Sequence, residues 1–427
     1  MALSRRKLLA AGLGTTAAAL TNARAGAEER TAPQGNPPIA APGDDWSAVR
    51  AQFRLSPDYI HLAGLLLASH PLPVREAIEQ HRTGLDQSPP LYLSAHNFRL
   101  QAEARQAAAS YLGARSQDIA LTDSTTMGLG LVYNGLQVRA GQELLTSTAD
   151  YYATRESLRY KAARAGAVLR EITLYADIRT VSEEEIVARL LGAVGPATRV
   201  IAVTWVHSGT GLKIPVRRIA ESLAAINAHR APADRALLCV DGVHGLGVEN
   251  ATVSDLGCDF FIAGTHKWIF GPRGSGLIWG YPAAQAACSP TIPSFTQDGT
   301  WGGQMSPGGY KPFEHQWAVA EAFRLHERLG KARVAERIHA LNRQLKEGLA
   351  GMTHVRLYTP RDEPLSAGIT CFDVEGLTPQ GVVARLRERR IIASTTPYRP
   401  SYARLAPAVF NTPEEIDQAL RAVRELA

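Results

Sequence analysis

The sequence predicts an α/β fold, in which a large domain with a mainly parallel sheet is followed by a smaller C-terminal α+β domain. Two observations lead to this prediction. Several short runs are apolar at every position rather than at alternate ones, which is typical of strands buried on both faces of a parallel sheet. Helical stretches separate several of these runs, as crossovers between parallel strands require. With 427 residues, the chain is also long enough for two domains.

The expected elements follow one another in a regular order up to about residue 310. The evenly apolar runs expected to form strands are residues 119–123, 143–147, 199–206, 236–243, 259–264 and 275–280. The stretches expected to form helices there are residues 73–85, 99–114, 182–194 and 215–230. The pattern then changes to a long helical region at 313–350, a strand within 365–376 and helices within 378–391 and 412–426. We therefore expect a large domain over residues 56–310 and a small domain over residues 311–427.

The amino terminus has the layout of an export signal. The stretch "SRRKLLAAGLGTTAAALTNARA" places Arg5 and Arg6 in tandem before a mildly apolar segment that ends in Ala-x-Ala at Ala25. This layout predicts a twin-arginine signal peptide over residues 1–25, followed by an N-terminal arm over residues 26–55. It implies a periplasmic protein that is exported by the twin-arginine translocation machinery and has no membrane anchor after cleavage.

Charge and cysteine content exclude several classes of partner. The chain has 46 basic and 40 acidic residues, and loss of residues 1–25 would leave 42 basic residues and a net charge of only +2. This balance implies no nucleic-acid partner. The cysteines form no CxxC pair, which disfavours a zinc site or a disulfide framework, although one disulfide in an oxidising compartment stays open. They are Cys239, Cys258, Cys288 and Cys371.

The first candidate binding feature lies where an expected strand gives way to a helix, in "LTDSTTMGLG" at residues 121–130. Ser124, Thr125 and Thr126 would place hydroxyls and free backbone N–H groups at the helix N-terminus. Such a terminus binds anions such as phosphate, because its N–H groups and the helix dipole favour negative charge. Taken alone, the motif is more simply explained as an ordinary N-cap.

Two polar residues follow a later apolar strand, in "VDGVHGLGV" at residues 240–248. Asp241 would emerge at the carboxyl end of its strand, where α/β sheets carry ligand-binding residues. There its carboxylate could pair with a protonated ring nitrogen, and this cation would keep the buried acid ionised. His244 could hydrogen-bond an oxygen on the same ring, although taken alone it is better explained as a core histidine.

The third feature is Lys267, in "FIAGTHKWIFGPRGSG" at the end of the next strand. A lysine in an apolar pocket has a depressed pKa and can bind an aldehyde covalently, although a lone lysine at a strand end is usually a surface residue. An anion site, an aspartate for a ring nitrogen and a lysine for an aldehyde are together what pyridoxal 5'-phosphate (PLP) requires. The occurrence of all three in this order predicts a PLP enzyme.

The motifs resemble those of class V aminotransferases, PLP enzymes of fold type I that include isopenicillin N epimerase-like proteins and cysteine desulfurases. The resemblance covers most of residues 55–425 and rests on "DSTTMG", "VHSGTGLKIPV", "VDGVHGLG", "AGTHKWIFGPRGSG" and "RLAPAVFNTPEEID". It implies a seven-stranded sheet and a homodimer with sites near the interface. It also implies that Thr125 and Thr126 contact the PLP phosphate, helped by Thr265 or His266.

The same resemblance assigns the remaining roles. Lys267 would bind the PLP aldehyde, Asp241 would bind the pyridine nitrogen, and His244 would lie near the ring oxygen. Arg404 would hold the substrate α-carboxylate, which suits a guanidinium because it offers two parallel hydrogen bonds.

The chain departs from its relatives at several positions. The stretch "ASTTPYRPSYAR" before Arg404 has no cysteine where desulfurases have their nucleophile, and Cys371 lies in the strand-like "ITCFDV". Desulfuration is therefore disfavoured. Where many relatives stack a histidine on the coenzyme ring, the chain reads "TSTADYYAT", so Tyr151 or Tyr152 would supply the aromatic face.

Two further departures concern the partner subunit and the substrate pocket. His315 and Gln316 replace a Gly-Thr pair that in many relatives reaches the partner's phosphate, which leaves a contribution of the partner subunit open. His61 and Leu62 occupy the region where relatives place an asparagine.

By its signal, length and motifs, the chain also resembles the exported PLP enzymes of pyoverdine siderophore maturation. This resemblance implies a siderophore-precursor peptide as substrate, whose glutamate, attached through its side chain, is converted to a succinamide with molecular oxygen as a candidate co-substrate. One alternative is an exported PLP-dependent aminotransferase or epimerase acting on a free or peptide-linked amino acid. Another is a non-catalytic siderophore- or peptide-binding protein, which the set of Lys267, Asp241 and Arg404 disfavours.

Overall fold

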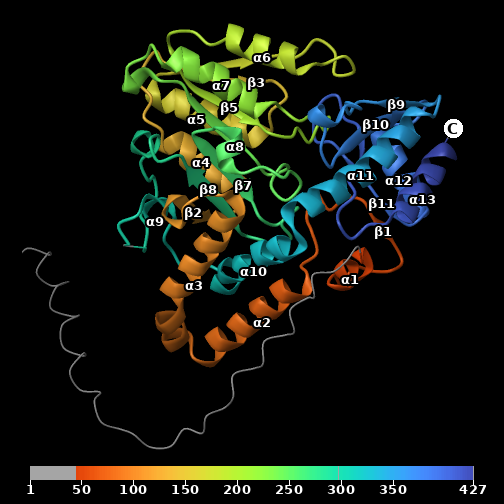
Figure 1. Cartoon of the computed structure of the whole chain (residues 1–427), viewed down its shortest axis with the longest axis horizontal. Helices are drawn as coiled ribbons and strands as arrows, with labels where there is room; N and C mark the ends of the chain where they lie inside the picture. Colours follow the sequence, from red (N-terminus) through yellow and green to blue (C-terminus); the bar gives the residue numbers. More distant parts are fainter. Residues whose placement is uncertain (1–44, 297, 427) are drawn as a thin grey trace, which may run out of the picture. The chain divides into compact units, whose positions relative to one another are not determined.

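A seven-stranded sheet forms the centre of the larger part of the molecule (Figure 1). The computed structural model describes residues 45–296 and 298–426, so the predicted signal peptide and most of the predicted arm lie outside the described residues. The strand order is β2-β8-β7-β6-β5-β3-β4, and only β8 runs antiparallel to its neighbours. This confirms the predicted α/β fold. The strands are β2 (Ile119–Thr122), β3 (Glu143–Ser147), β4 (Val168–Ile172), β5 (Thr198–Thr204), β6 (Leu237–Asp241), β7 (Phe260–Gly264) and β8 (Gly276–Gly280).

Strand β4 is the one member of this sheet that the sequence did not predict. It lies at the edge and pairs only with β3. None of its residues is buried, so it lacks the continuous apolar character of the other strands. The predicted strands form because nearly all of their residues are buried between layers of helices.

Helices connect the parallel strands and pack against the sheet and one another. Helix α4 (Thr125–Gly135) packs against β7, β8 and α5 (Tyr152–Ala165), and α7 (Val216–Asn227) packs against α6 (Glu183–Gly192) and α8 (Val253–Leu256). The helix predicted from residue 99 begins ten residues earlier, because Pro89 and Pro90 lie in its first turn, where proline is tolerated. The other helices before residue 310 are α1 (Trp46–Ala51), α2 (Leu72–Gln87), α3 (Pro89–Leu112) and α9 (Trp301–Met305).

The long helical region predicted at 313–350 is two helices. Gly330, with a φ of 84°, separates α10 (Phe313–Leu329) from α11 (Lys331–Ala350), because a left-handed backbone ends the first helix. Helix α10 packs against α2 and α3, whereas α11 packs against α13 and a second sheet.

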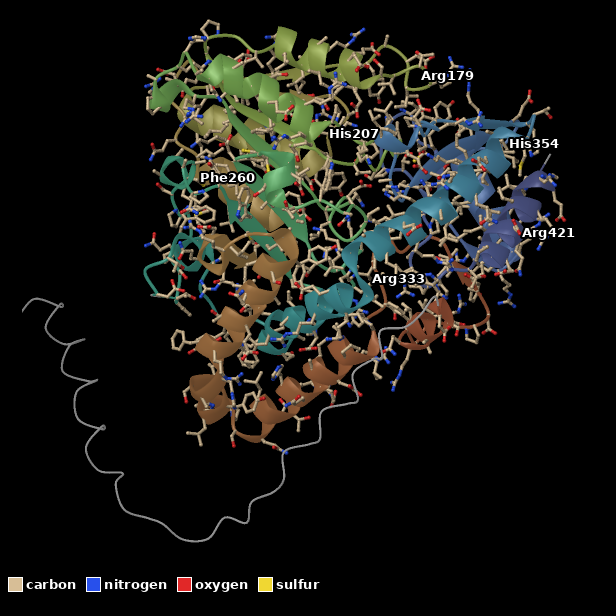
Figure 2. The ribbon with its side chains drawn as sticks, in the orientation of Figure 1. Arg179, His207, Phe260, Arg333, His354 and Arg421 are labelled. Atoms are coloured by element: carbon tan, nitrogen blue, oxygen red, sulfur yellow. The ribbon has the colours of Figure 1, made fainter. Side chains whose placement is uncertain are left out.

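The second sheet has four strands in the order β12-β13-β10-β9, and a short parallel pair, β1 with β11, lies beside it. Figure 2 shows His354 and Arg421 among these C-terminal elements and Phe260 in the large sheet. The predicted domain boundary at residue 310 stays a prediction. The elements are β1 (Ile60–His61), β9 (Val355–Leu357), β10 (Thr370–Val374), β11 (Ile391–Ile392), β12 (Ser394–Thr395), β13 (Ala403–Leu405), α12 (Pro379–Glu388) and α13 (Pro413–Arg424).

Three classes of feature are not found among the described residues. No helix there is long and apolar enough to cross a membrane, and no group of three or more His, Cys, Asp or Glu side chains there is arranged to hold a metal ion. All four cysteines are buried and free, so the disulfide that the sequence left open is not formed.

Candidate active site

The strand directions bring the candidate residues to one edge of the large sheet. Strand β2 is antiparallel to β8, and β8 is antiparallel to β7, so β2 runs in the same direction as β5, β6 and β7. The carboxyl ends of these strands therefore meet, which is where α/β folds bind ligands. Thr125 follows β2, Asp241 ends β6, and Lys267 follows β7.

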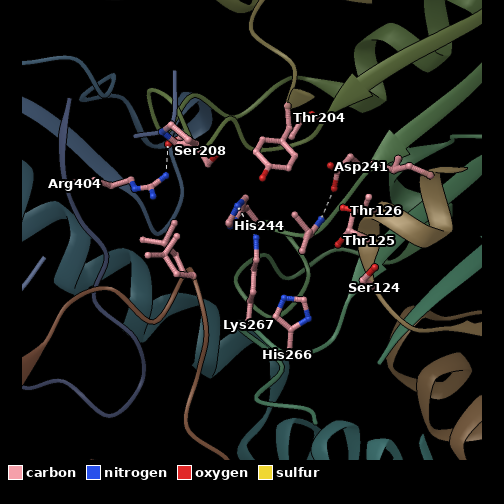
Figure 3. A pocket seen from close by; sticks show the side chains of 16 residues that line it. Ser124, Thr125, Thr126, Thr204, Ser208, Asp241, His244, His266, Lys267 and Arg404 are labelled. Carbon is pink, nitrogen blue, oxygen red and sulfur yellow. Dashed lines mark hydrogen bonds between the residues drawn. The ribbon is translucent and has the colours of Figure 1, made fainter. Parts of the chain in front are cut away.

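A cavity of about 340 Å³ opens at this edge. Its lining includes every predicted site residue except Thr265. Figure 3 shows Lys267 pointing toward His244, with Thr125 and Thr126 on the side of Asp241 and Arg404 on the opposite side. The predicted residues in the lining are Thr125, Thr126, Tyr151, Asp241, His244, His266, Lys267 and Arg404.

The N-terminus of α4 forms one end of the cavity. The Ser124 hydroxyl caps the helix by accepting from the N–H of Met127. The N–H groups of Thr125 and Thr126 lie in the first turn and have no acceptor within the helix, so they are available to an anion. The Thr125 hydroxyl accepts from the N–H of Gly264 at 2.8 Å, which joins this helix end to the end of β7.

Gly264 lets these groups approach closely. A Cβ atom at this position would lie 2.8 Å from His266 Cε1 and 2.9 Å from Thr125 Oγ1. His266 is half-buried, and burial lowers its pKa, so it faces the cavity as a neutral ring. Thr265 points the other way: its hydroxyl bonds Ser275 at 2.5 Å, because neighbouring side chains at a strand end alternate in direction.

Asp241 is a buried carboxylate that has no hydrogen-bonded cation among the described residues. It is 1% exposed, and its Oδ1 accepts from the N–H of Val243 at 3.1 Å. Burial raises the pKa of Asp241 to about 6, although the Val243 bond and nearby Lys267 oppose the rise. A protonated ring nitrogen placed beside Asp241 would supply the missing positive charge.

Lys267 extends into the cavity from the loop after β7. Burial lowers the pKa of Lys267 to about 8, with Asp241 opposing this shift and Arg404 adding to it. Its Nζ lies 3.2 Å from Nε2 of His244. With a pKa of about 8, roughly a tenth of the Lys267 amine is neutral at pH 7, far more than for an ordinary lysine, and the neutral amine is the nucleophile.

Arg404 is oriented by three acceptors, two on strand β12 and one in the loop after β5. Its Nε donates to the Ser394 hydroxyl at 3.0 Å, Nη1 donates to the Ser208 carbonyl at 2.9 Å, and Nη2 donates to the Thr395 carbonyl at 3.1 Å. A guanidinium has five N–H groups, one on Nε and two on each terminal nitrogen. Three are used in these bonds, so one N–H remains free on Nη1 and one on Nη2. This pair matches the two oxygens of a carboxylate.

The aromatic wall is formed by Tyr151 rather than by Tyr152. Tyr151 lines the cavity, whereas Tyr152 is 59% exposed and is not part of the lining. The two rings contact edge to face, with centroids 4.6 Å apart, and the ring centroid of Tyr398 lies 6.3 Å from that of Tyr151.

Sequence reasoning missed other residues of the site. From the segment after β1, Leu65 and Leu66 line the cavity, whereas Leu62 is buried in the C-terminal core. Ser208 also lines the cavity and, through its carbonyl, orients Arg404. The motif "VHSGTG" was the available signal for Ser208, but it did not reveal the backbone contact.

A buried acid supports the strands behind the cavity. Asp150 accepts from the Thr204 N–H at 2.6 Å, the Ser147 N–H at 2.8 Å and the Thr146 hydroxyl at 2.9 Å. His207 lies 3.7 Å away. Burial alone would raise the pKa of Asp150, but His207 and these donors lower it to about 2. Asp150 therefore remains ionised and ties β3 to the end of β5.

Comparison with known proteins gives one family. The model of aminotransferase class V matches residues 91–417. Isopenicillin N epimerase of Amycolatopsis lactamdurans is 27% identical over 410 residues, covering 90% of this chain and 98% of that protein. Cysteine desulfurase of Klebsiella pneumoniae (strain 342) is 26% identical over 364 residues, with coverages of 78% and 84%. The solved structure of a C-DES mutant with glycine covalently linked to its PLP cofactor has a TM-score of 0.80 at 23% identity, covering 88% and 99%.

Fold and site together define a PLP-dependent enzyme of fold type I. The chain belongs to the class V aminotransferase family. This confirms the predicted family, enzyme class and cofactor, and it removes the support for a non-catalytic binding protein.

The residues present fit PLP on structural grounds. Asp241 is buried without a hydrogen-bonded counter-ion among the described residues, and the amine of Lys267, a partly exposed side chain, lies in the lining of the same cavity. The first-turn N–H groups of Thr125 and Thr126 offer an anion site at one end. These are the three groups that would hold the pyridine nitrogen, the aldehyde and the phosphate.

Proposed function

We propose that this enzyme acts on the free α-amino acid end of a larger, peptide-like substrate. The chain resembles the PvdN-type enzyme of pyoverdine maturation, and the reaction proposed is conversion of a glutamate, attached through its side chain, to a succinamide. The observation that carries the proposal is that Arg404 is the only cation of the described cavity lining left to bind substrate.

The charge of the lining favours a substrate with one free carboxylate. Lys267 is taken by the coenzyme, and the pKa values of His244 and His266 are lowered by burial, so neither ring carries charge near pH 7. Free glutamate would bring a second carboxylate, which would be partly desolvated without a partner. A glutamate whose side-chain carboxyl is blocked as an amide avoids this cost.

The cysteines argue against sulfur transfer. Cys371 lies opposite Arg404 in the register of β10 with β13. It is fully buried, and burial raises the pKa of its thiol to about 12. A nucleophilic cysteine must be a thiolate with access to the substrate, so Cys371 does not serve this role.

The chain's own residues divide the work as follows. Arg404 binds the α-carboxylate through its two remaining N–H groups and so fixes the direction of the bonds at Cα. The Lys267 amine can take a proton from the substrate Cα or return one, since its pKa lies near 8. Tyr151 shields one face of the site from water. PLP, when bound, supplies an electron sink for the bond broken at Cα.

The overall reaction balances with molecular oxygen as oxidant. The amino acid end R–CH(NH2)–COOH and O2 give R–CO–NH2, CO2 and water. The amine nitrogen is retained as the amide nitrogen, the carboxylate leaves as CO2, and one oxygen atom enters the amide.

Mass spectrometry of a side-chain-linked glutamyl peptide incubated with the PLP-loaded enzyme in air tests this proposal. The expected product is lighter by CH2O, and its formation should stop without oxygen. A product that requires a keto acid and carries a carbonyl in place of the amine would instead identify an aminotransferase. An unchanged mass with inverted configuration at Cα would identify an epimerase.

The epimerase is the second candidate. It is favoured by the likeness to isopenicillin N epimerase, which extends over 90% of this chain. An exported aminotransferase or epimerase could use the same Arg404 and Lys267, because both reactions also begin at Cα.

We also propose periplasmic export through the twin-arginine pathway. The basis is the sequence around Arg5 and Arg6. Replacing both by lysine should retain the protein in the cytoplasmic fraction, whereas unchanged export would reject this route.

A homodimer is the quaternary structure we propose. Large apolar side chains that are at least half exposed gather around a groove between α3 and the segment after residue 293, as expected of a subunit interface. Light scattering at micromolar concentration should give twice the chain mass, and a monomer would contradict the proposal. The side chains concerned are Phe98, Phe295 and Tyr310.

A further inference from the structure

Trp268 follows the candidate lysine directly and hydrogen-bonds the histidine beside it. Its indole Nε1–H donates to Nδ1 of His244 at 3.2 Å. Both side chains are buried, with exposed fractions of 1% for Trp268 and 5% for His244. On the other side of the ring, Nε2 of His244 lies 3.2 Å from Nζ of Lys267. Three side chains therefore form a hydrogen-bonded chain that ends at the reactive amine.

The chemistry of tryptophan fixes the proton in this chain. The indole N–H can only donate, so Nδ1 of His244 must accept and carries no proton. The neutral ring then has its proton on Nε2. A doubly protonated ring would place two N–H groups against each other at Nδ1, so the contact with Trp268 also opposes the charged form.

The position of the proton on Nε2 determines which form of Lys267 fits. An Nε2–H group needs an acceptor, and a neutral amine offers its lone pair. An ammonium group has only donors, so protonation of Lys267 would break its contact with His244. The arrangement thus favours the neutral amine.

We propose that Trp268 is a positioning residue that locks His244 in the Nε2–H tautomer and thereby holds Lys267 as the neutral nucleophile that captures PLP. Trp268 acts through His244 and does not itself line the cavity. The proposal requires PLP binding at Lys267 but is independent of the substrate. With PLP bound at Lys267, the Nε2–H of His244 would be available to donate to an oxygen on the coenzyme ring.

Other charged groups bear on the same equilibrium. Asp241 favours the ammonium form of Lys267, whereas Arg404 disfavours it. Around His244, the charges of Lys267, Arg404 and His266 all disfavour a protonated ring, in addition to burial. These charges do not decide which nitrogen of the neutral His244 ring carries the proton. The indole N–H of Trp268 does, because it donates to Nδ1.

The first test measures how fast apoprotein captures added PLP as a function of pH. Capture needs the neutral amine, so the rate should rise with pH through the Lys267 pKa. Trp268→Phe lets His244 adopt the other tautomer and accept from an ammonium group. Loss of this one hydrogen bond should move the midpoint up by roughly 0.5 to 1 pH unit, which slows capture below the midpoint by roughly three- to tenfold.

Trp317→Phe is the matched control. Trp317 is also buried, at 2% exposed, but its indole nitrogen has no hydrogen-bond partner among the described residues. The control variant removes the same atoms from a core without breaking a hydrogen bond, so its midpoint should equal that of the wild type. An unshifted midpoint in Trp268→Phe, or an equal shift in Trp317→Phe, would overturn the proposal.

A second measurement needs no change at Trp268 and so stands even if that variant does not fold. Nitrogen-15 NMR of wild-type apoprotein labelled at histidine reports the tautomer, with the His244 signals assigned by their loss in His244→Gln. The proposal requires an unprotonated Nδ1 and a protonated Nε2 across the pH range of the capture experiment. A proton on Nδ1 would refute it. Such a result would leave PLP binding and the proposed reaction untouched.

Discussion

The guanidinium of Arg404, on β13 of the C-terminal sheet, donates from Nη1 to the backbone carbonyl of Ser208, in the loop after β5 of the large sheet, at 2.9 Å. The contact fixes the plane of the guanidinium across the two sheets before a substrate arrives. It also makes the carboxylate site dependent on both parts of the chain.

Arg404→Lys should therefore greatly weaken substrate binding without loss of the coenzyme. A lysine has three donors at a single point and cannot reach the Ser394 and Thr395 acceptors while also pairing with two carboxylate oxygens. Substrate affinity should fall by at least roughly 100-fold, since two charge-assisted hydrogen bonds are lost. Titration of the PLP absorbance band with substrate measures this. Ser394→Ala, which removes one orienting bond, should have a smaller effect, and equal effects would contradict the account.

Asp241→Asn should stabilise the apoprotein and weaken the holoenzyme. The folded pKa of Asp241 is about 6, above its ordinary value of 3.8. As pH rises from 3.8 through 6, the unfolded chain therefore loses this proton first, and the apoprotein loses stability that is not regained at higher pH. At pH 7 the free energy of unfolding of the variant, measured with urea, should exceed that of the wild type by roughly 2 to 3 kcal/mol. Below pH 3.8 the two proteins should have the same free energy of unfolding.

The same variant should release PLP more readily, because its amide cannot pair with a ring cation. Dialysis of the loaded protein, followed at the coenzyme band, measures this loss. A variant that is less stable as apoprotein and retains PLP as well as the wild type would show that Asp241 is a structural acid.

The charge of Asp150 should affect stability in the opposite direction to that of Asp241. Its folded pKa is about 2 and its ordinary value is 3.8, so its contribution to stability is present above pH 3.8 and is lost as pH falls toward 2. Asp150→Asn should cost roughly 2 kcal/mol or more at pH 7, because an amide NH2 would face backbone N–H donors. Urea unfolding measures the loss. Glu156→Gln, which removes an exposed ion pair with Arg159, should leave the urea midpoint almost unchanged, because solvent screens such a pair.

Tyr151 and Tyr152 should differ in their effect on the coenzyme. Tyr151→Ala removes the aromatic side chain from the cavity wall and should weaken PLP binding by roughly three- to tenfold, the usual worth of ring stacking. Tyr152→Ala changes an exposed ring and should leave PLP affinity unchanged. Fluorescence titration of both apoproteins with PLP separates them, and a larger loss in Tyr152→Ala would reverse the assignment.

Much of the fold could be predicted because buried strands leave a local signal. The runs that became β6 and β7 are apolar at nearly every position, and Asp241 and Lys267 stand out as polar residues at the ends of these runs. Strand β4 could not be found in this way, since its position at the edge of the sheet leaves it exposed. The boundary between α10 and α11 depends on a single glycine conformation at Gly330.

The parts of the site that escaped prediction depend on contacts between distant segments. Two examples are the hydrogen bond from Trp268 to His244 and the one from Thr204 to Asp150. Both depend on how β3, β5, β6 and β7 are aligned, and no single stretch of sequence shows that alignment. The sequence also left Thr265 and His266 as alternatives. Only the local backbone direction decides that His266 faces the cavity while Thr265 faces Ser275.

The most direct test of the account is to locate the lysine that binds PLP. Burial lowers the pKa of three lysines, Lys267, Lys331 and Lys346, to about 8, so a lowered pKa alone does not select one. Only Lys267 shares a cavity with Asp241 and Arg404. Borohydride reduction of the PLP-incubated protein, followed by peptide mass spectrometry, should find the coenzyme on Lys267. Coenzyme on Lys331 or Lys346, or on no lysine at all, would contradict the assignment of the site.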